Sequence, residues 1–188
     1  FSTLLLNEDL DQEDKKDFPV IIEKNSNQLT ELFEDILQVS DLSSSLELFP
    51  MERIDILPIC AGLLDMCKGK TKKSGITWLF ESGLDECLVK TNDKYLQHVV
   101  EHILNNAAKF TTAGTIRMNL MRTGGKIRIM VSDTGIGIPA DKAEYIFDRF
   151  TKLDDFMPGT GLGLYSCRLI VTRLGLSLIH ISEPTRLR

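Results

Sequence analysis

A heptad repeat in residues 17–42 constrains the fold of this chain more than any other feature. Its seam positions are spaced alternately by four and three residues: Phe18, Ile22, Asn25, Leu29, Leu32, Ile36 and Val39. This spacing predicts a long helix with a single, largely apolar stripe that needs a partner. Residues 1–6, FSTLLL, are expected to end an antiparallel helix of the same hairpin, and a second copy of the chain would complete a four-helix bundle. Packing within one chain fits the heptads equally well.

Residues 41–45, Asp-Leu-Ser-Ser-Ser, interrupt this seam and predict a linker. The linker divides the chain into a first domain of residues 1–46 and a second domain of residues 47–175. Pro19 falls in the first turn of the seam, where a helix that begins at or just before Phe18 tolerates it.

The second domain mixes strands and helices without a regular βαβ alternation. Strands are predicted over residues 48–54, with Pro50 as an interruption, and over residues 76–80, 87–89, 115–121 and 126–132. Helices are predicted over residues 57–70, 92–109 and 166–174. Thr123, Gly124 and Gly125 predict a hairpin turn between the last two strands. This mixture predicts an α+β sandwich with the helices on one face of the sheet.

The composition excludes several classes of protein. The net charge is −5 and the pI about 5.3, which argues against a nucleic-acid-binding protein, because phosphate backbones require basic surface. The four cysteines form no CxxC pair and are expected to be small buried hydrophobes in a reducing compartment. No segment approaches the ~18 apolar residues of a membrane span, and no signal peptide is visible. Because the sequence opens at Phe1, inside an apolar segment, we interpret it as a fragment.

The predicted helix at residues 92–109 brings three polar residues together. His102 and Asn106 lie one turn apart on one face, and Lys109 follows three residues later. An amide oxygen suits Mg²⁺ and a lysine suits phosphate, so this pair fits a magnesium-bound polyphosphate. Polar residues on an amphipathic helix are nevertheless more often its solvated face.

Three further segments carry glycines or aromatic residues. Residues 133–137, DTGIG, follow a strand, so the Asp133 carboxylate can accept a hydrogen bond from an exocyclic amine while the glycines let the backbone pass close to a ligand. Residues 159–164, GTGLGL, run into a helix and offer backbone amides to phosphate. They match neither a P-loop nor a dinucleotide-binding fingerprint. Residues 145–150, YIFDRF, taken alone, predict a short helix with a buried aromatic stripe.

The order and spacing of these segments together resemble a known family, although no single segment is specific enough to do so. NNAAKF, DTGIGIP, IFDRF and GTGLGL resemble the N, G1, F and G2 boxes of sensor histidine kinases. These kinases belong to the GHKL family, with gyrase-type, mismatch-repair and chaperone ATPases. The resemblance covers about residues 47–175 and implies the GHKL, or Bergerat-type, sandwich. The heptad region is similar to the second helix of the kinases' dimerisation and phosphoacceptor domain.

The resemblance implies a role for each motif residue. Asn106 would ligate Mg²⁺, Lys109 would contact the phosphates of ATP, and Asp133 would bind the adenine amino group. Gly135 and Gly137 would begin a mobile lid, which Phe147 and Phe150 would anchor. The G2 residues that would close it around the triphosphate are Gly159, Thr160, Gly161, Leu162 and Gly163.

Three departures from the family pattern are visible. His102 stands where the kinases usually have Asn, so it is expected to assist proton removal or to line the pocket. The phosphoacceptor stretch, His-Glu-x-Arg-Thr-Pro, is absent and is expected to lie just upstream of FSTLLL. Residues 176–188, LSLIHISEPTRLR, replace the closing strand hairpin of the family. We interpret them as translated adapter sequence, a divergent natural tail being the alternative. Either way, a sheet edge would be exposed.

The function implied by the resemblance is ATP:protein-histidine phosphotransfer in a cytoplasmic two-component pathway. The kinase would be a homodimer through its helical hairpin, and a response regulator would receive the phosphoryl group. A GHKL ATPase that works by conformational closure and a catalytically inactive dimeric scaffold are the alternatives. Hydrolysis of ATP by water, with no phosphohistidine in the complete protein, would favour the first alternative, and failure of the chain to bind ATP would support the second.

Overall fold

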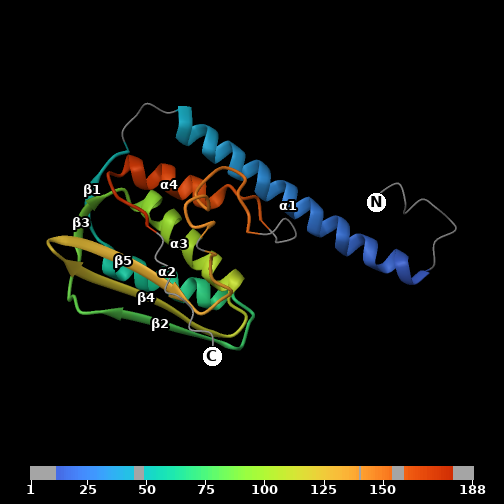
Figure 1. Cartoon of the computed structure of the whole chain (residues 1–188), viewed down its shortest axis with the longest axis horizontal. Coiled ribbons are helices and arrows are strands. Elements are labelled where there is room, and N and C mark those ends of the chain that lie inside the picture. The colour runs from blue at the N-terminus through green and yellow to red at the C-terminus, as the bar shows by residue number, and fades with distance from the viewer. Residues whose placement is uncertain (1–11, 45–48, 140, 154–158, 180–188) are drawn as a thin grey trace.

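The computed structural model describes residues 12–44, 49–139, 141–153 and 159–179 (Figure 1). One three-stranded sheet is covered on one face by α2 (Ile56–Lys70) and α3 (Asp93–Phe110). Helix α4 (Gly163–Arg173) packs on α3, and α1 (Gln12–Ser44) packs on α4 while its N-terminal end extends away from the body. The predicted α+β sandwich with helices on one face is confirmed.

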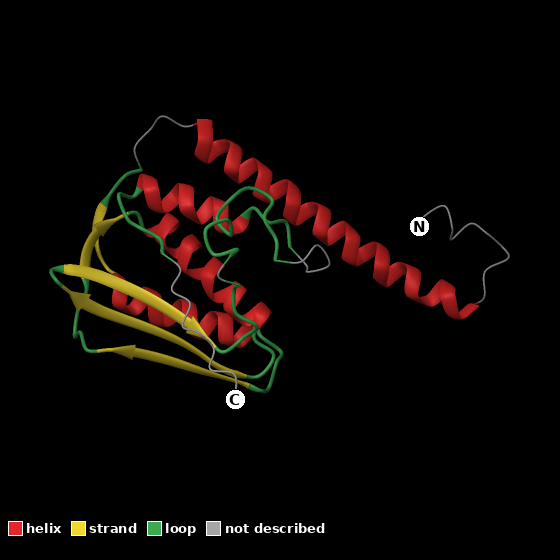
Figure 2. Cartoon of the chain, in the orientation of Figure 1, coloured by secondary structure: helices red, strands yellow, loops and turns green. Residues whose placement is uncertain are grey.

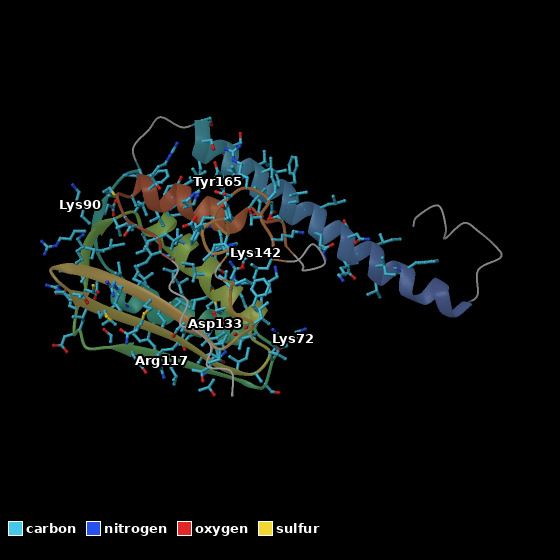
Figure 3. All side chains as sticks on the ribbon, viewed as in Figure 1. Lys72, Lys90, Arg117, Asp133, Lys142 and Tyr165 are labelled. Atoms are coloured by element: carbon cyan, nitrogen blue, oxygen red, sulfur yellow. The ribbon has the colours of Figure 1, made fainter. Side chains whose placement is uncertain are left out.

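The sheet has the strand order β2–β4–β5, with β2 at Ile76–Ser82, β4 at Gly114–Thr123 and β5 at Lys126–Asp133. Strands β2 and β4 are parallel, whereas β4 and β5 form the predicted antiparallel hairpin. Gly124 and Gly125 have φ of 56° and 76°, the left-handed conformation that a two-residue hairpin turn requires. Arg117 pairs with Glu81 at 3.1 Å on the face away from the helices (Figure 3).

A second, two-stranded sheet joins β1 (Glu52–Asp55) to β3 (Leu88–Thr91) in antiparallel order. The strand predicted over residues 48–54 therefore begins only at Glu52. Pro50 cannot donate to a ladder, and its carbonyl instead accepts a hydrogen bond from Asn92 at 2.8 Å. Residue 48 lies outside the described residues.

Helix α1 is longer than the heptads predicted. It begins at Gln12, so Pro19 lies inside the helix and not in its first turn. Asp41 to Ser44 are helical rather than part of a linker, because Leu42 is buried against α4 and the Ser44 hydroxyl bonds to the Ser40 carbonyl at 2.8 Å. The predicted partner helix at residues 1–6 lies outside the described residues. No described helix combines the length and the apolar character needed to cross a bilayer.

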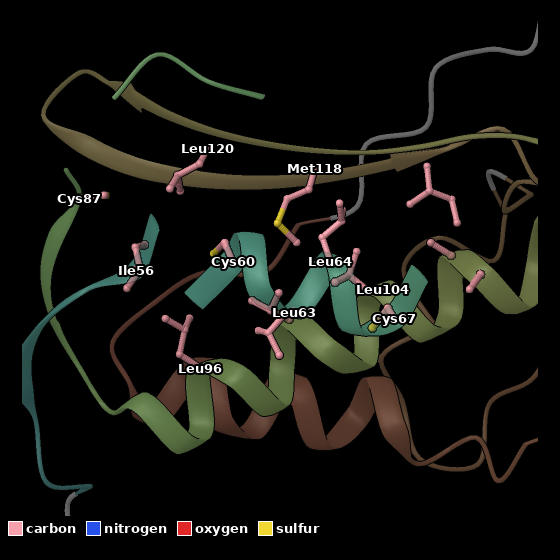
Figure 4. Packing of buried hydrophobic residues seen from close by; sticks show 14 residues of the cluster. Ile56, Cys60, Leu63, Leu64, Cys67, Cys87, Leu96, Leu104, Met118 and Leu120 are labelled. Atoms are coloured by element: carbon pink, nitrogen blue, oxygen red, sulfur yellow. The ribbon is translucent and has the colours of Figure 1, made fainter. Parts of the chain in front are cut away.

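The main core lies between the sheet and the two helices on it. Met118 and Leu120 of β4 point toward Cys60 and Leu64 of α2 and toward Leu104 of α3 (Figure 4). All four cysteines are free and buried, as predicted, and burial raises the pKa of the Cys60 thiol to about 12. A smaller cluster between α3, α4 and the end of α1 includes Leu42, Val99, Ile170 and Leu174. The two clusters hold α3 on both sides and so fix the orientation of its remaining face.

Candidate functional site

Helix α3 carries the first group of candidate residues. Its N-terminus is capped by Asn92, whose side chain accepts a hydrogen bond from the Tyr95 amide at 3.1 Å. Because two core clusters bury its other faces, the helix presents a defined polar edge. His102 and Asn106 are half-buried on this edge, and Lys109 is exposed with its Nζ 5.2 Å from the centroid of the Phe110 ring.

The two neighbouring asparagines of α3 differ in their surroundings. Asn105 accepts a hydrogen bond from the Cys67 thiol of α2, with 3.5 Å between Sγ and Oδ1. Asn106 makes no side-chain hydrogen bond to any of the residues that the structure describes. The amide oxygen of Asn106 is thus available to a ligand, one turn before Lys109.

Asp133 ends β5 beside the last turn of α3 (Figure 3). Its Oδ1 accepts a hydrogen bond from the Gly135 amide at 2.9 Å, and the buried Thr111 hydroxyl lies 3.5 Å from the same oxygen. The loop continues across the end of α3, where the Ile136 amide donates to the Phe110 carbonyl at 3.4 Å. The Asp133 side chain is exposed, and its Oδ2 makes no hydrogen bond to any described residue.

Gly135 has no room for a side chain. A Cβ at this position would lie 2.5 Å from the Phe110 carbonyl oxygen and 2.8 Å from the Asp133 carboxylate. Gly137, two residues later, has φ of 70° but open space around it. The first glycine therefore serves a close approach of the loop to α3, and the second serves a backbone turn.

Residues 141–150 form a series of turns, so the short helix that the pattern of residues 145–150 predicted is absent from this described segment. Their anchors point toward α4: Asp148 pairs with Arg168 at 3.1 Å, and the Arg149 guanidinium lies 4.7 Å from the centroid of the Tyr165 ring. Ile146 is the buried residue of the segment, whereas Phe147 is half-buried and Phe150 is 61% exposed.

The glycine-rich segment at residues 159–164 closes against the other motifs. A Cβ on Gly159 would lie 2.6 Å from Lys109 Nζ, and one on Gly161 would lie 2.7 Å from the Phe150 backbone. A Cβ on Gly163 would lie within 2.0 Å of two atoms of the His102 ring. All four motif segments therefore meet at the C-terminal half of α3, among the loops that follow β5 (Figure 2).

Thr160 ties this segment to α1. Its hydroxyl donates to the Asp35 carboxylate of α1 and also accepts a hydrogen bond from the Leu162 amide at 3.2 Å. Leu162 is buried and precedes the first turn of α4. One side chain thus shapes the turn into α4 and fixes α1 against it.

The comparison with family models decides the identity of this arrangement. The family described as histidine kinase-, DNA gyrase B-, and HSP90-like ATPase matches residues 91–187, about half of the chain. The chain belongs to this family. Its ATPase domain is that of histidine kinases, of the kind found in two-component systems, and ATP is the ligand that the family implies.

Curated sensor kinases are similar to this histidine kinase domain over much of its length. The adaptive-response sensory kinase SasA of Synechocystis is 34% identical over 145 residues, which cover 74% of this chain and 38% of SasA. The sensor histidine kinase RcsC of Escherichia coli is 32% identical over 168 residues, 85% of this chain and 17% of RcsC. The chain thus spans less than half the length of each of these relatives.

Solved histidine kinase structures share the fold. Full-length ShkA in complex with AMPPNP has a TM-score of 0.74 at 23% identity, covering 92% of this chain and 36% of ShkA. ThkA in complex with the response regulator TrrA has a TM-score of 0.74 at 22% identity, covering 94% of this chain and 49% of ThkA. These matches extend beyond the ATPase domain of residues 91–187, so they include α1.

His102 of this kinase domain lies against α4. Its imidazole packs on Gly163, and its ring centroid is 6.3 Å from that of His98. Burial, reinforced by His98 and Lys109 and opposed by Asp35 and Glu101, lowers the pKa of His102 to about 4. The imidazole is therefore neutral at pH 7, and it holds the start of α4 at a fixed distance from α3.

Lys73 supports the site in a way that its local sequence does not predict. Its Nζ donates to the carbonyls of Ala108, Lys109 and Thr111 at 2.8, 3.0 and 2.9 Å. A cation at this end of α3 compensates the unpaired carbonyls and the negative end of the helix dipole. A lysine after a helix is common, so the signal that the sequence offers for this contact is the cluster of lysines at residues 70–73.

The donor set fits a magnesium nucleotide better than a metal alone. Among the described residues, no group of three or more His, Cys, Asp or Glu side chains could hold a metal ion. One free amide oxygen on Asn106, a cation on Lys109 and backbone amides at the start of α4 instead suit a metal already carried by a polyphosphate.

Proposed function

We propose that this chain is the ATP-binding part of a sensor histidine kinase that, in the complete protein, transfers the γ-phosphoryl group of Mg-ATP to a histidine. An aspartate of a response regulator would then receive it. The observation that supports this most is the convergence of Lys109, Asp133 and four tightly packed glycines on the C-terminal half of α3.

The bonding of Asp133 supports recognition of adenine. Its Oδ1 is occupied by Gly135, whereas its Oδ2 makes no hydrogen bond to any described residue. We assign Oδ2 to the exocyclic amino group of the base. Asn106 would hold Mg²⁺ by its amide oxygen, and Lys109 would contact the phosphates. Mg²⁺ would supply neutralisation of charge on the transferring group.

The loops after β5 are proposed to close over the nucleotide. Gly135 and Gly137 would begin this lid, with Phe147 and Phe150 at its far end. The glycine-rich segment would place backbone amides around the triphosphate. The contacts with Arg168 and Tyr165 hold residues 148 and 149 to α4. Closure would therefore move this end of the lid together with α4.

Phosphoryl transfer requires little covalent chemistry from the residues of this chain. A histidine nitrogen would attack the γ-phosphorus, the bond to the β,γ-bridging oxygen would break, and ADP would leave. Catalysis would rest on positioning and on charge neutralisation near Lys109. The contact between His102 and Gly163 supports a role for His102 in positioning α4 rather than in binding the metal.

Binding of Mg-ATP tests this proposal. We expect the chain to bind Mg-ATP and Asp133→Asn to bind it about 10- to 100-fold more weakly, the loss expected for a charge-assisted hydrogen bond. Calorimetry measures both affinities. Asp85→Asn, an exposed carboxylate in the loop after β2, is the matched control and should bind normally. Absence of binding by the folded parent chain would favour the dimeric scaffold.

The exposed apolar face of α1 supports a homodimer. Leu29, Phe33, Ile36 and Leu37 lie on adjoining turns, with Leu29 67% and Phe33 63% exposed. We propose that a second copy covers this face and that the kinase works in the cytoplasm, either free or as part of a membrane-anchored sensor.

We expect Phe33→Asp to convert the dimer into a monomer, because a carboxylate would be buried without a partner. Sedimentation equilibrium measures the change. Gln28→Glu, which adds the same charge to another face of α1, should leave the dimer intact. A parent chain that is monomeric at all concentrations would contradict the homodimer.

A further inference from the structure

An open cleft of about 600 Å³ lies between α1 and the proposed nucleotide site. Its lining comes from three parts of the chain: Val20, Glu23, Lys24, Asn27 and Gln28 of α1, Lys109 of α3, and Gly159 of the glycine-rich segment. Helix α1 lies outside the residues that match the ATPase family, so this wall of the cleft is not part of the family's site.

The α1 residues form one continuous stripe. They follow the spacing i, i+3, i+4, i+7 and i+8, which places them on one side of a helix. Asp35, which bonds to Thr160, lies 11 residues after Lys24 and therefore close to the same side, three turns later. The contact that fixes α1 to the glycine-rich segment thus also turns Lys24 toward the cleft.

The chemistry of the lining selects an anion. It holds two lysines and two amides against one carboxylate, and Gly159 contributes backbone. Lys24 forms no hydrogen bond or ion pair with any described residue, so its ammonium group is available. A phosphate group with its surrounding oxygens matches one lysine on each wall, with the two amides beside Lys24.

The position of the cleft identifies which part of a nucleotide it receives. Lys109 and Gly159 line it, whereas Asp133, the residue assigned to the base, does not. The cleft is therefore at the phosphate end of the site, and its α1 wall lies beyond the groups that the ATPase domain itself provides.

We propose that Lys24 binds the terminal phosphoryl group of a nucleoside triphosphate together with Lys109. This inference rests on the proposed function, because it assumes a nucleotide with its base at Asp133. It makes α1 a part of the site, so that the chain distinguishes ATP from ADP through the placement of a helix outside the ATPase domain. Glu23, on the same wall, opposes the phosphates and weakens the preference.

Nucleotide affinities of single-charge variants test the proposal. We expect Lys24→Met to weaken binding of Mg-ATP about fivefold and to leave Mg-ADP within about twofold, as one Coulombic contact at a partly exposed site predicts. Glu23→Gln should tighten Mg-ATP by a smaller factor, again without effect on Mg-ADP. Lys90→Met, an exposed lysine of β3 far from the cleft, should change neither affinity.

The outcomes separate this inference from the proposed function. If the parent chain binds both nucleotides but Lys24→Met changes neither affinity, or changes both equally, the role of Lys24 is overturned and the kinase proposal stands. If the folded parent chain binds neither nucleotide, the kinase proposal itself is overturned and the inference falls with it. A raised ATP affinity in Lys24→Met would also overturn the inference.

Discussion

Gly161→Ala is expected to abolish binding of ATP and to lower the free energy of unfolding by about 2–4 kcal/mol. The residue has φ of 76°, which an alanine adopts only with strain. The added Cβ would also lie 2.7 and 2.9 Å from the carbonyl carbon and Cα of Phe150. Backbone atoms cannot rotate out of the way, and Phe150 is itself held at φ of 60°. Calorimetry with Mg-ATP and urea unfolding measure the two effects.

Gly137→Ala is the matched control for this substitution. Gly137 has nearly the same backbone conformation, with φ of 70°, but no atom lies within 4 Å of the added Cβ. The free energy of unfolding of Gly137→Ala should therefore fall only by the strain of the left-handed conformation, about 1 kcal/mol. Equal losses in the two variants would show that strain alone, without the collision with Phe150, accounts for the requirement for glycine at 161.

The parts of the site that follow from sequence are those encoded by neighbouring residues. The cap at Asn92, the hairpin at Gly124 and Gly125, and the position of Asp133 at the end of a strand all depend on a few consecutive residues. Local patterns of charge, glycine and apolar spacing express such features directly. The resemblance to histidine kinases rests on the same short segments.

The parts that do not follow from sequence are contacts between distant segments. Lys73 reaches the end of α3 across 35 to 38 residues, and Asp35 meets Thr160 across 125. Nothing near either residue encodes its partner. The turns at residues 145–150 likewise replace a predicted helix because Asp148 and Arg149 are held by α4, which outweighs their local preference. Tertiary contacts also explain why α1 continues through Asp41 to Ser44.

His102 is expected to make the stability of the chain depend on pH between about 6.5 and 4. Its pKa is about 4 in the folded chain, below the ordinary value of 6.5 that applies after unfolding. Below pH 6.5 the unfolded chain binds a proton that the folded chain does not, so the free energy of unfolding falls as pH falls. The loss should reach about 2 kcal/mol near pH 4, less than the full pKa difference gives because the imidazole is partly exposed.

Urea unfolding from pH 7.5 to 4, on the parent chain and on His102→Asn, measures this contribution. The neighbouring His98 also has a lowered pKa through burial and titrates in the same direction, so the parent curve alone does not isolate His102. The difference between the two curves does, because Asn does not titrate in this range and His98 is common to both. Parallel curves would contradict a lowered pKa at His102.

The position of His102 implies that acid acts on the nucleotide site before it unfolds the chain. A protonated imidazole would place a positive charge against Gly163, at the N-terminus of α4, where the helix dipole is also positive. Moving the ring away would release the start of α4 and the preceding glycines, whereas the main core beneath the sheet would keep its packing. As the pH is lowered, Mg-ATP affinity should therefore fall more steeply in the parent chain than in His102→Asn. This difference should be seen at pH values where circular dichroism still shows both chains folded.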